Sequence, residues 1–495
     1  MDRRDALKAM AGLGAASLLR GCATGSLRRP DLIRLENERP GTRDWMPTNG
    51  RVKGSRCPWV EGYCSRTSVR PGESIEFFVS TDPASPFVID LYRMGYYQGL
   101  GGRHMARLGS FSGKPQEIPA PGPRRVRDCR WEPCAGLTIP DDWPSGVYIG
   151  KLTAEREKVE SLVIFVVRDD RPADVMVQVS DSTWQAYNEW PGKWSMYYHD
   201  ARPGQMGYHG PDTAVSFNRP YEQFRISKFG AGSGCFFGEE FPLTYWLEKE
   251  GVDVTYVSCL DTHHDPAGLE RVNGFFSVAH DEYYSLAMFQ NLKGAIAKGL
   301  NVAFLSGNTC YEMVEFTPQR TMRRVAIFGE HEPGEDKVIE YGRPELPGGF
   351  PSEATLIGAE TIYPVMSCGD WTCAMPDHWL FEGTGMKKGD SIPGLVGYEW
   401  HGKPAAIPGL EVLASGTARA SKEMTGVYTA TIYPGPKGNF VFNASTIWWV
   451  NGLAAPPAYR QGPWYGVAPK GPDARVQRIT SNVLARMKSA TSAVS

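Results

Sequence analysis

Two largely apolar runs, each followed by a tyrosine, have the pattern of buried strands. They span residues 274–279 and 301–305, and such runs are typical of strands that are covered on both faces of a sheet. Residues 285–300, between them, carry apolar side chains at helical spacing. The order strand, helix, strand predicts a right-handed crossover between parallel strands. Because the carboxyl ends of such strands open onto one crevice, we expect Tyr283 and Tyr311 to meet at one pocket.

The chain before this unit consists mainly of short β-type runs separated by Pro and Gly. The runs lie at residues 73–80, 87–92, 146–152 and 161–167. Their regular spacing predicts an all-β sandwich of immunoglobulin-like type.

From residue 173 the pattern changes to alternating strands and helices. Residues 174–179 and 252–257 are expected strands, and residues 241–250 are an expected helix that ends at Gly251. The alternation predicts a layered α/β domain with a parallel central sheet, of amidotransferase-like or flavodoxin-like type. The stretch 190–233 is rich in Gly, Pro, Tyr and His and lacks periodicity, so we expect it to roof the pocket.

These patterns divide the chain into four parts. They are an export signal at 1–28, the sandwich at 29–170, an α/β catalytic domain at 171–455, and a C-terminal helix and tail at 456–495. The first part resembles a twin-arginine signal, with Arg3 and Arg4 before a small apolar stretch, and Cys22 resembles the lipid-bearing cysteine of a lipoprotein. We therefore expect an exported protein, periplasmic or anchored to a membrane by a lipid at Cys22.

Composition narrows the function classes. The 495 residues are 41% apolar, enough to bury substantial cores. The formal net charge of −2 gives no reason to expect nucleic acid as a partner. Three close cysteine pairs are suited to local disulfides in an oxidising compartment: Cys57 and Cys64, Cys129 and Cys134, Cys368 and Cys373.

Three short motifs lie in this part of the chain: His-Asp-Glu-Tyr-Tyr-Ser at residues 280–285, Gly-Asn-x-x-Tyr at residues 307–311, and Gly-Tyr-Glu at residues 397–399. The first is similar to a His-x-Glu-Tyr-aromatic-Ser/Thr motif and the second to a Gly-Asn…Tyr motif. Together, in this order, they resemble one known family, the large subunit of N,N-dimethylformamidase and its relatives. The likeness covers residues 170–455 on a matching pattern of strands and helices.

The resemblance implies a metal centre and an activity. In that family two tyrosinates and one glutamate bind a mononuclear iron that hydrolyses an amide, which implies Tyr283, Tyr311 and Glu399 as the ligands here. Phenolate and carboxylate oxygens are hard anionic donors that favour ferric iron over zinc or copper. The implied reaction is hydrolysis of the C–N bond of a small linear amide. The family's enzyme works with a separate small subunit, so we expect either such a partner or a homo-oligomer.

Amide hydrolysis also needs a proton acceptor and a donor to the leaving amine. His280 and Glu282 flank Tyr283 and are the candidates. Asn308 is a candidate donor to the developing oxyanion, or else it caps a helix that follows. Residues 182–188 are similar to a segment that family members carry after their first strand, which implies three substrate-binding residues: Trp184, Tyr187 and Asn188.

Two other functions stay open. Cys310 follows a strand in a tight turn that resembles the nucleophile elbow of cysteine amidotransferase-like folds, which suggests a cysteine-nucleophile amidohydrolase. Glu312 would raise the pKa of that thiol and weaken it as a nucleophile. The second is a non-enzymatic, exported carbohydrate-binding protein, for which a sandwich with exposed aromatic side chains would be suited.

Overall fold

The computed structural model describes residues 28–201, 203–222, 232–329, 350–362, 367–421, 423–459 and 471–489. All but the last residue of the expected export signal at 1–28, including Cys22, and the end of the tail at 490–495 lie outside these ranges. Within them, every helix is too short or too polar to cross a membrane.

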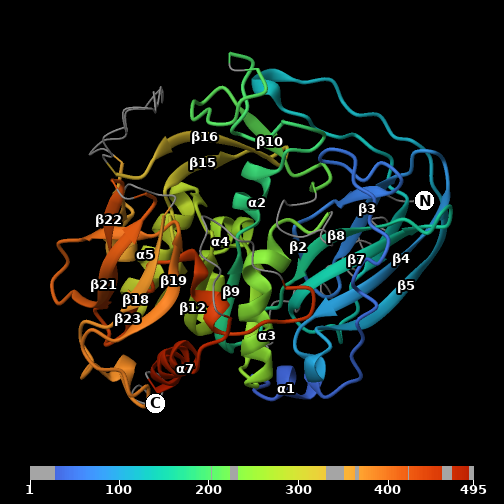
Figure 1. Ribbon diagram of the computed structural model, residues 1–495. Coiled ribbons are helices and arrows are strands. Elements are labelled where there is room, and N and C mark those ends of the chain that lie inside the picture. The colour runs from blue at the N-terminus through green and yellow to red at the C-terminus, as the bar shows by residue number, and fades with distance from the viewer. Residues whose placement is uncertain are drawn as a thin grey trace, which may run out of the picture.

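The N-terminal part forms two facing sheets. Their strands are β1 (Glu61–Cys64), β2 (Ser68–Val69), β3 (Ser74–Ser80), β4 (Pro86–Met94), β5 (Gly102–Ser112), β6 (Ala135–Thr138), β7 (Gly146–Ala154) and β8 (Glu160–Val167). One sheet has the order β2-β8-β7-β4-β5 (Figure 1), and the other has the order β1-β3-β6. Alternate residues of β3, among them Ile75 and Phe77, pack between the sheets against Phe87 and Ile89 of β4. This part matches the predicted sandwich.

A nine-stranded mixed sheet forms the centre of the rest. Its strands are β9 (Ala173–Val179), β11 (Val254–Ser258), β12 (Val272–Ala279), β14 (Asn301–Ser306), β18 (Ser367–Thr372), β19 (Ser391–Tyr398), β21 (Glu411–Arg419), β22 (Thr425–Pro434) and β23 (Phe440–Asn443). The order is β11-β9-β12-β14-β23-β22-β21-β18-β19. The pairs from β11 to β23 are parallel, and the pairs from β23 to β19 are antiparallel.

The crossover between β12 and β14 is formed by α5 (Leu286–Lys298). The Ser285 hydroxyl accepts a hydrogen bond from the Met288 N–H and caps the start of this helix, and Gly299, at φ 119°, ends it. The predicted strand, helix, strand unit is therefore present.

The prediction of a flavodoxin-like α/β fold with a parallel central sheet is wrong. Strands take 35% and helices only 21% of the structure, and the central sheet is mixed. The reason lies in strands such as β22, whose residues 428–433 are all buried, so its sequence lacks the alternation that marks a half-exposed antiparallel strand. The short segment 420–424 joins β21 to β22, and it leaves room for a hairpin but not for a helical crossover.

A smaller sheet lies above α2 (Asp181–Tyr187) in Figure 1. It consists of β10 (Ala214–Ser216), β13 (Tyr283–Tyr284), β15 (Glu312–Phe316) and β16 (Thr321–Ile327), in the order β10-β16-β15-β13. The chain turns after β12, where Ala279 has φ 53°, and Tyr283 enters this second sheet instead of extending β12. A two-stranded sheet pairs β17 (Ala359–Thr361) with β20 (His401–Pro404).

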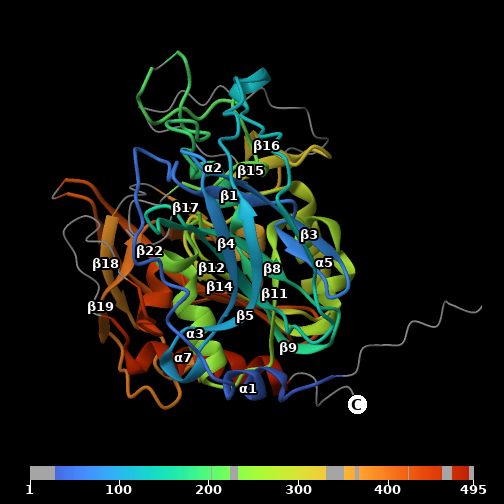
Figure 2. The same ribbon diagram turned by 90° about the vertical axis from the view of Figure 1, so that its right-hand side faces the viewer.

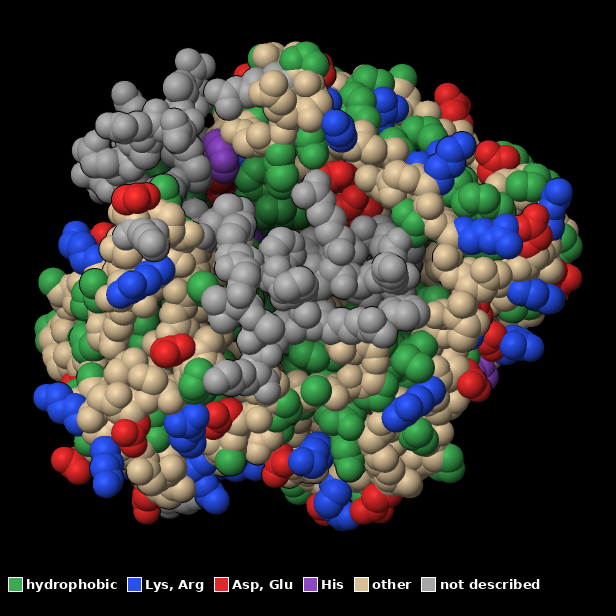
Figure 3. Space-filling view, viewed as in Figure 1, with side chains coloured by type: hydrophobic (Ala, Val, Ile, Leu, Met, Phe, Trp, Pro, Cys, Tyr) green, Lys and Arg blue, Asp and Glu red, His purple; other side chains and the backbone are tan. Residues whose placement is uncertain are grey.

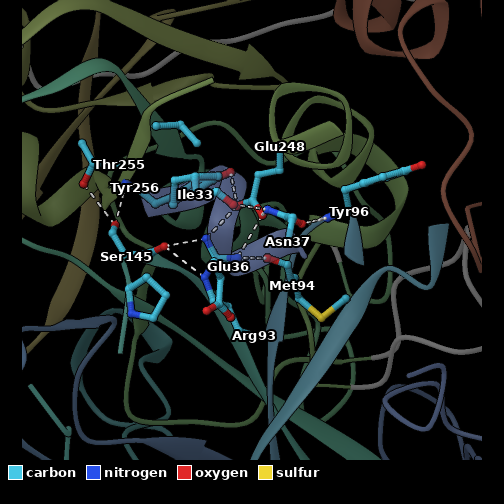
Figure 4. Close-up of polar contacts among 12 residues, drawn as sticks. Ile33, Glu36, Asn37, Arg93, Met94, Tyr96, Ser145, Glu248, Thr255 and Tyr256 are labelled. Atoms are coloured by element: carbon cyan, nitrogen blue, oxygen red, sulfur yellow. Dashed lines mark hydrogen bonds and ion pairs between the residues drawn. The ribbon is translucent and has the colours of Figure 1, made fainter. Parts of the chain in front are cut away.

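A buried ion pair joins the sandwich to the second part (Figure 4). Arg93 of β4 donates from its two Nη atoms to the two carboxylate oxygens of Glu248 in α3 (Phe241–Lys249), at 2.9 and 2.7 Å. Asn37 of α1 (Leu32–Asn37) donates to the same carboxylate. One hydrophobic core runs from the outer face of the five-stranded sheet, at Tyr92 and Met94, to β9 and β11. The two parts are thus packed on one another, and Figure 2 views the molecule with the sandwich in front.

The remaining helices are α4 (Cys259–His264), α6 (Ala354–Ile357) and α7 (Ala474–Ser489), the last at the position predicted for the C-terminal helix. All nine cysteines among the described residues are free thiols, so the expected local disulfides are absent there. On the face shown in Figure 3, basic and acidic side chains are interspersed, as the small net charge would suggest.

Candidate functional site

Two chain segments that follow parallel strands lie side by side. Ala279 at the end of β12 is in register with Ser306 at the end of β14. Beyond these strands, the Tyr311 N–H donates to the Glu282 carbonyl at 2.9 Å, and Tyr283 pairs with Glu312. The backbones that carry Tyr283 and Tyr311 are therefore neighbours at the carboxyl edge of the sheet.

Helix α2 holds the first of these segments in place. The Thr183 hydroxyl accepts the Glu282 N–H at 3.0 Å, and the Ser182 hydroxyl donates to the Tyr283 carbonyl at 2.8 Å. The same helix carries Tyr187, so its position relative to Glu282 is fixed by the backbone.

His280 lies between two buried carboxylates. Its Nε2 atom is 2.7 Å from Oε2 of Glu399 and 3.2 Å from Oε2 of Glu282, and its Nδ1 atom is 3.2 Å from the Tyr398 hydroxyl. Burial alone would lower the pKa of His280, but the two carboxylates raise it well above its usual range. The two carboxylates therefore favour the protonated form of the imidazole.

Glu399 is held from its other side by the loop after β14. The Asn308 amide donates to Oε2 of Glu399 at 3.1 Å. Gly307 touches the Glu399 carbonyl so closely that a Cβ atom at this position would lie 2.2 Å from it. His401 accepts the Thr309 N–H on Nε2 and contacts the Asn443 side chain through Nδ1, which ties the loop to β20 and β23. Burial lowers the pKa of His401 to about 4, so this histidine is neutral.

Three tyrosines continue the chain of contacts away from Glu282. The Tyr187 hydroxyl donates to Glu282 at 2.8 Å, the Tyr197 hydroxyl lies 2.8 Å from that of Tyr187, and the Tyr283 hydroxyl lies 2.6 Å from that of Tyr197. Burial raises the pKa of all three phenols well above the ordinary value. At the far end, Arg324 donates to the Tyr283 hydroxyl at 2.9 Å and forms a buried ion pair with Glu312.

These contacts join most of the predicted site residues into one continuous set, which we call the His280 network. Its members are Tyr187, Tyr197, His280, Glu282, Tyr283, Asn308, Arg324 and Glu399. Tyr197 and Arg324 were not predicted individually. Tyr197 does lie in the 190–233 stretch that was expected to cover the pocket, which is a usable signal. Arg324 is placed by the pairing of β15 with β16 and has no motif.

Two predicted substrate-binding residues point elsewhere. Trp184 donates to Oε1 of Glu240 at 2.7 Å. Asn188 donates to the Pro220 carbonyl and accepts the Trp190 and Glu222 N–H groups, so it organises a loop. Asn308 does not cap a helix, because strand β15 follows it.

The residues were tested against the implied iron. Arg324 donates a hydrogen bond to the Tyr283 oxygen, which would stabilise a phenolate, and Glu399 supplies a buried carboxylate. The donor types therefore fit a hard cation. Among the described contacts, however, Tyr283 and Glu399 are connected through the His280 network and not directly. No group of three or more His, Cys, Asp or Glu residues in the described ranges is arranged to hold a metal, so a cation here would depend on the tyrosines.

The comparison with known families agrees with the motifs. The sequence profile described as N,N-dimethylformamidase beta subunit-like, C-terminal, matches residues 88–462. The chain belongs to this family. The match begins inside β4 of the sandwich, so the N,N-dimethylformamidase beta subunit-like region is wider than the 170–455 range expected from the motifs. A search of curated proteins finds no match.

Cys310, the alternative nucleophile, is fully buried in the apolar cluster around α5. It has the positive φ, 55°, of a tight turn. Burial raises the pKa of its thiol well above the ordinary value, and the carboxylates of Glu353 and Asp281 add to the effect. These surroundings disfavour the thiolate that a cysteine nucleophile needs.

Proposed function

We propose that this protein hydrolyses the C–N bond of a small amide in the manner of N,N-dimethylformamidase, with a mononuclear ferric ion held by Tyr283, Tyr311 and Glu399. The observation that carries the proposal is the backbone pairing that brings Tyr283 and Tyr311 to one edge of the sheet, beside the His280 network that contains Glu399. The family membership supports it independently.

The bound iron would supply Lewis acidity toward the amide carbonyl and toward a water molecule. The proton transfers would fall to the chain's own residues. His280, protonated at Nε2 between two carboxylates, is suited to give a proton to the leaving amine nitrogen. Glu282 is suited to accept the proton from the attacking water, since its carboxylate is held by His280 and Tyr187. The balance is one proton taken at Glu282 and one given at His280.

Asn308 has a different role in this proposal. One hydrogen of its Nδ2 atom is used on Glu399, and the second is available for the oxygen of a substrate carbonyl. The Tyr197 and Tyr187 rings, stacked with centroids 4.6 Å apart, form an aromatic wall beside Glu282.

Export of the protein, a lipid at Cys22 and a small-subunit partner stay proposals. The family description contains the words beta subunit-like, which supports a partner chain. Co-expression with a candidate small subunit, followed by size-exclusion chromatography, tests this part.

Metal analysis of the untagged protein, combined with two tyrosine variants, tests the function. We expect iron at about one atom per chain, a purple or red phenolate charge-transfer colour, and release of amine from formamide, N-methylformamide or N,N-dimethylformamide. Tyr311→Phe should lose the colour and at least about tenfold to a hundredfold in activity or iron affinity. Tyr433→Phe is the control, because it removes the hydroxyl of another buried tyrosine, which donates to the Leu356 carbonyl. This variant should keep the colour, the activity and the iron affinity of the wild type. The proposal would be overturned if the wild-type protein hydrolysed the amide without iron and the Tyr311→Phe variant were equally active.

A further inference from the structure

A second cleft lies between the sandwich and α2, apart from the His280 network. Its volume is about 450 Å³ with the open mouth included. Strands β1 and β8, the end of β9 and the first turns of α2 line it. Its apolar wall consists of Phe165, Val179, Trp184 and Phe217. The cleft is thus open to solvent and partly apolar, and its charged lining residues are one acid, Asp181, and three arginines: Arg66, Arg219 and Arg320.

Asp181 supplies one buried negative charge at this cleft. The residue is 2% exposed, and its Oδ1 atom accepts the Cys259 N–H at 2.8 Å. Its Oδ2 atom is buried and has no hydrogen-bond partner in the described structure. Burial raises the pKa of this carboxyl to about 7. A buried carboxylate oxygen of this kind is costly unless a ligand satisfies it.

Arg320 supplies a positive charge on the same lining. Its Nη1 atom donates to the Cys64 and Ser65 carbonyls, and its Nε and Nη2 atoms have no partner among the described residues. Asp181 is one of the charges that act on Arg320, yet the two form no ion pair within the described ranges. Arg219 also lines the cleft, but its Nε, Nη1 and Nη2 atoms already donate to carbonyl and amide oxygens of the protein. It is therefore less suited than Arg320 to bind a ligand.

Two opposite charges that share a cleft without pairing favour a ligand that carries both complementary charges. We propose that this cleft binds a small zwitterion, an α-amino acid with an apolar side chain. Its ammonium group would donate to Oδ2 of Asp181, and its carboxylate would accept from Nε and Nη2 of Arg320, the fork that suits a carboxylate. Its side chain would lie against Trp184 and Phe217. This site does not depend on the proposed amide hydrolysis.

Calorimetric titration with three ligands of one shape tests the proposal on the wild-type protein. L-Leucine carries both charges, isopentylamine lacks the carboxylate, and 4-methylpentanoate lacks the ammonium group. We expect L-leucine to bind at least about tenfold more tightly than either analogue, since each lost charge contact is worth 1.4 kcal/mol or more. No detectable binding of L-leucine, or equal binding of all three compounds, would overturn the proposal without any variant.

Matched variants then assign the two contacts. Asp181→Asn should weaken the binding of L-leucine at least about tenfold and leave the binding of 4-methylpentanoate unchanged. Arg320→Gln should likewise weaken the binding of L-leucine and should leave the binding of isopentylamine unchanged. Circular dichroism and the melting temperature establish that each variant is folded. Tyr311→Phe should bind L-leucine as the wild type does, so a failed hydrolase test leaves this result independent. Unchanged L-leucine affinity in folded Asp181→Asn would contradict the assignment.

Discussion

The Nε2 atom of His280 lies 2.7 Å from Oε2 of Glu399 and 3.2 Å from Oε2 of Glu282. One imidazolium thus bridges two buried carboxylates that come from the segments after β12 and β19. Two negative charges so close together would repel each other strongly without it. His280 is therefore both the electrostatic centre of the site and the group best placed to hold a proton there.

Replacing Glu399 by Gln should show how much this bridge contributes. The change keeps an oxygen for Asn308 but leaves His280 with one carboxylate, so we expect the free energy of unfolding to fall by about 3 kcal/mol. Glu360→Gln is the control, because its partner Lys403 is exposed and such pairs contribute less than about 1 kcal/mol. Urea denaturation at pH 7 measures both. Equal losses in the two variants would mean that the bridge has no special energetic role.

His401 should make the protein sensitive to acid. Its folded-state pKa of about 4 is below the unfolded value of about 6.5, so its contribution to stability is present above pH 6.5 and is lost as the pH falls toward 4. The difference corresponds to about 3 kcal/mol.

Comparing the variants His401→Gln and His264→Gln isolates that contribution. His401→Gln cannot titrate and should lose less stability than the wild type between pH 6.5 and 4, as measured by urea denaturation at each pH. His264→Gln makes the same substitution at an exposed position and is the control for the exchange itself. Carboxylates titrate in all three proteins and cancel in the comparison. Parallel curves for His401→Gln and wild type would show that His401 is not the source.

The sequence predicted the local units of this protein well. The crossover from β12 through α5 to β14 follows from apolar periodicity, and the structure adds that Ser285 caps the start of the helix and Gly299 ends it. The sandwich strands follow from short runs between Pro and Gly. Both signals act over neighbouring residues, which is why one sequence suffices to read them.

The remainder depends on pairings between distant segments. The antiparallel half of the central sheet was missed because β22 is buried on both faces, like a parallel strand. Arg324 reaches Tyr283 because β16 pairs with β15, and β15 pairs with β13. Glu399 could be placed at the site by its motif alone, whereas the contact between its carboxylate and His280 is set by how the loop after β19 packs on Gly307.

Gly307→Ala should push the loop after β14 away from the segment that carries Glu399. An added Cβ atom would lie 2.2 Å from the Glu399 carbonyl and 2.9 Å from the Ile447 nitrogen, and both are backbone atoms with little freedom to move. We expect the free energy of unfolding to fall by about 1–3 kcal/mol, as for other overpacked positions, and the activity to fall with it. Gly294→Ala, in the exposed face of α5 with open space around it, should instead stabilise by about 1 kcal/mol. A Gly307→Ala protein as stable and active as wild type would argue against close packing here.

Cys310→Ala distinguishes the two hydrolase mechanisms. Because the Cys310 thiol is buried and its pKa is raised, we expect amide turnover to be unchanged, with a loss of stability of about 1 kcal/mol. Iodoacetamide should label Cys310 only in urea, as followed by mass spectrometry. Cys259→Ala is the matched control, since Cys259 is equally buried and the pKa of its thiol is likewise raised by burial. A large loss of turnover in Cys310→Ala alone, with the iron content intact, would make this thiol the nucleophile and would refute the acid–base roles given to His280 and Glu282.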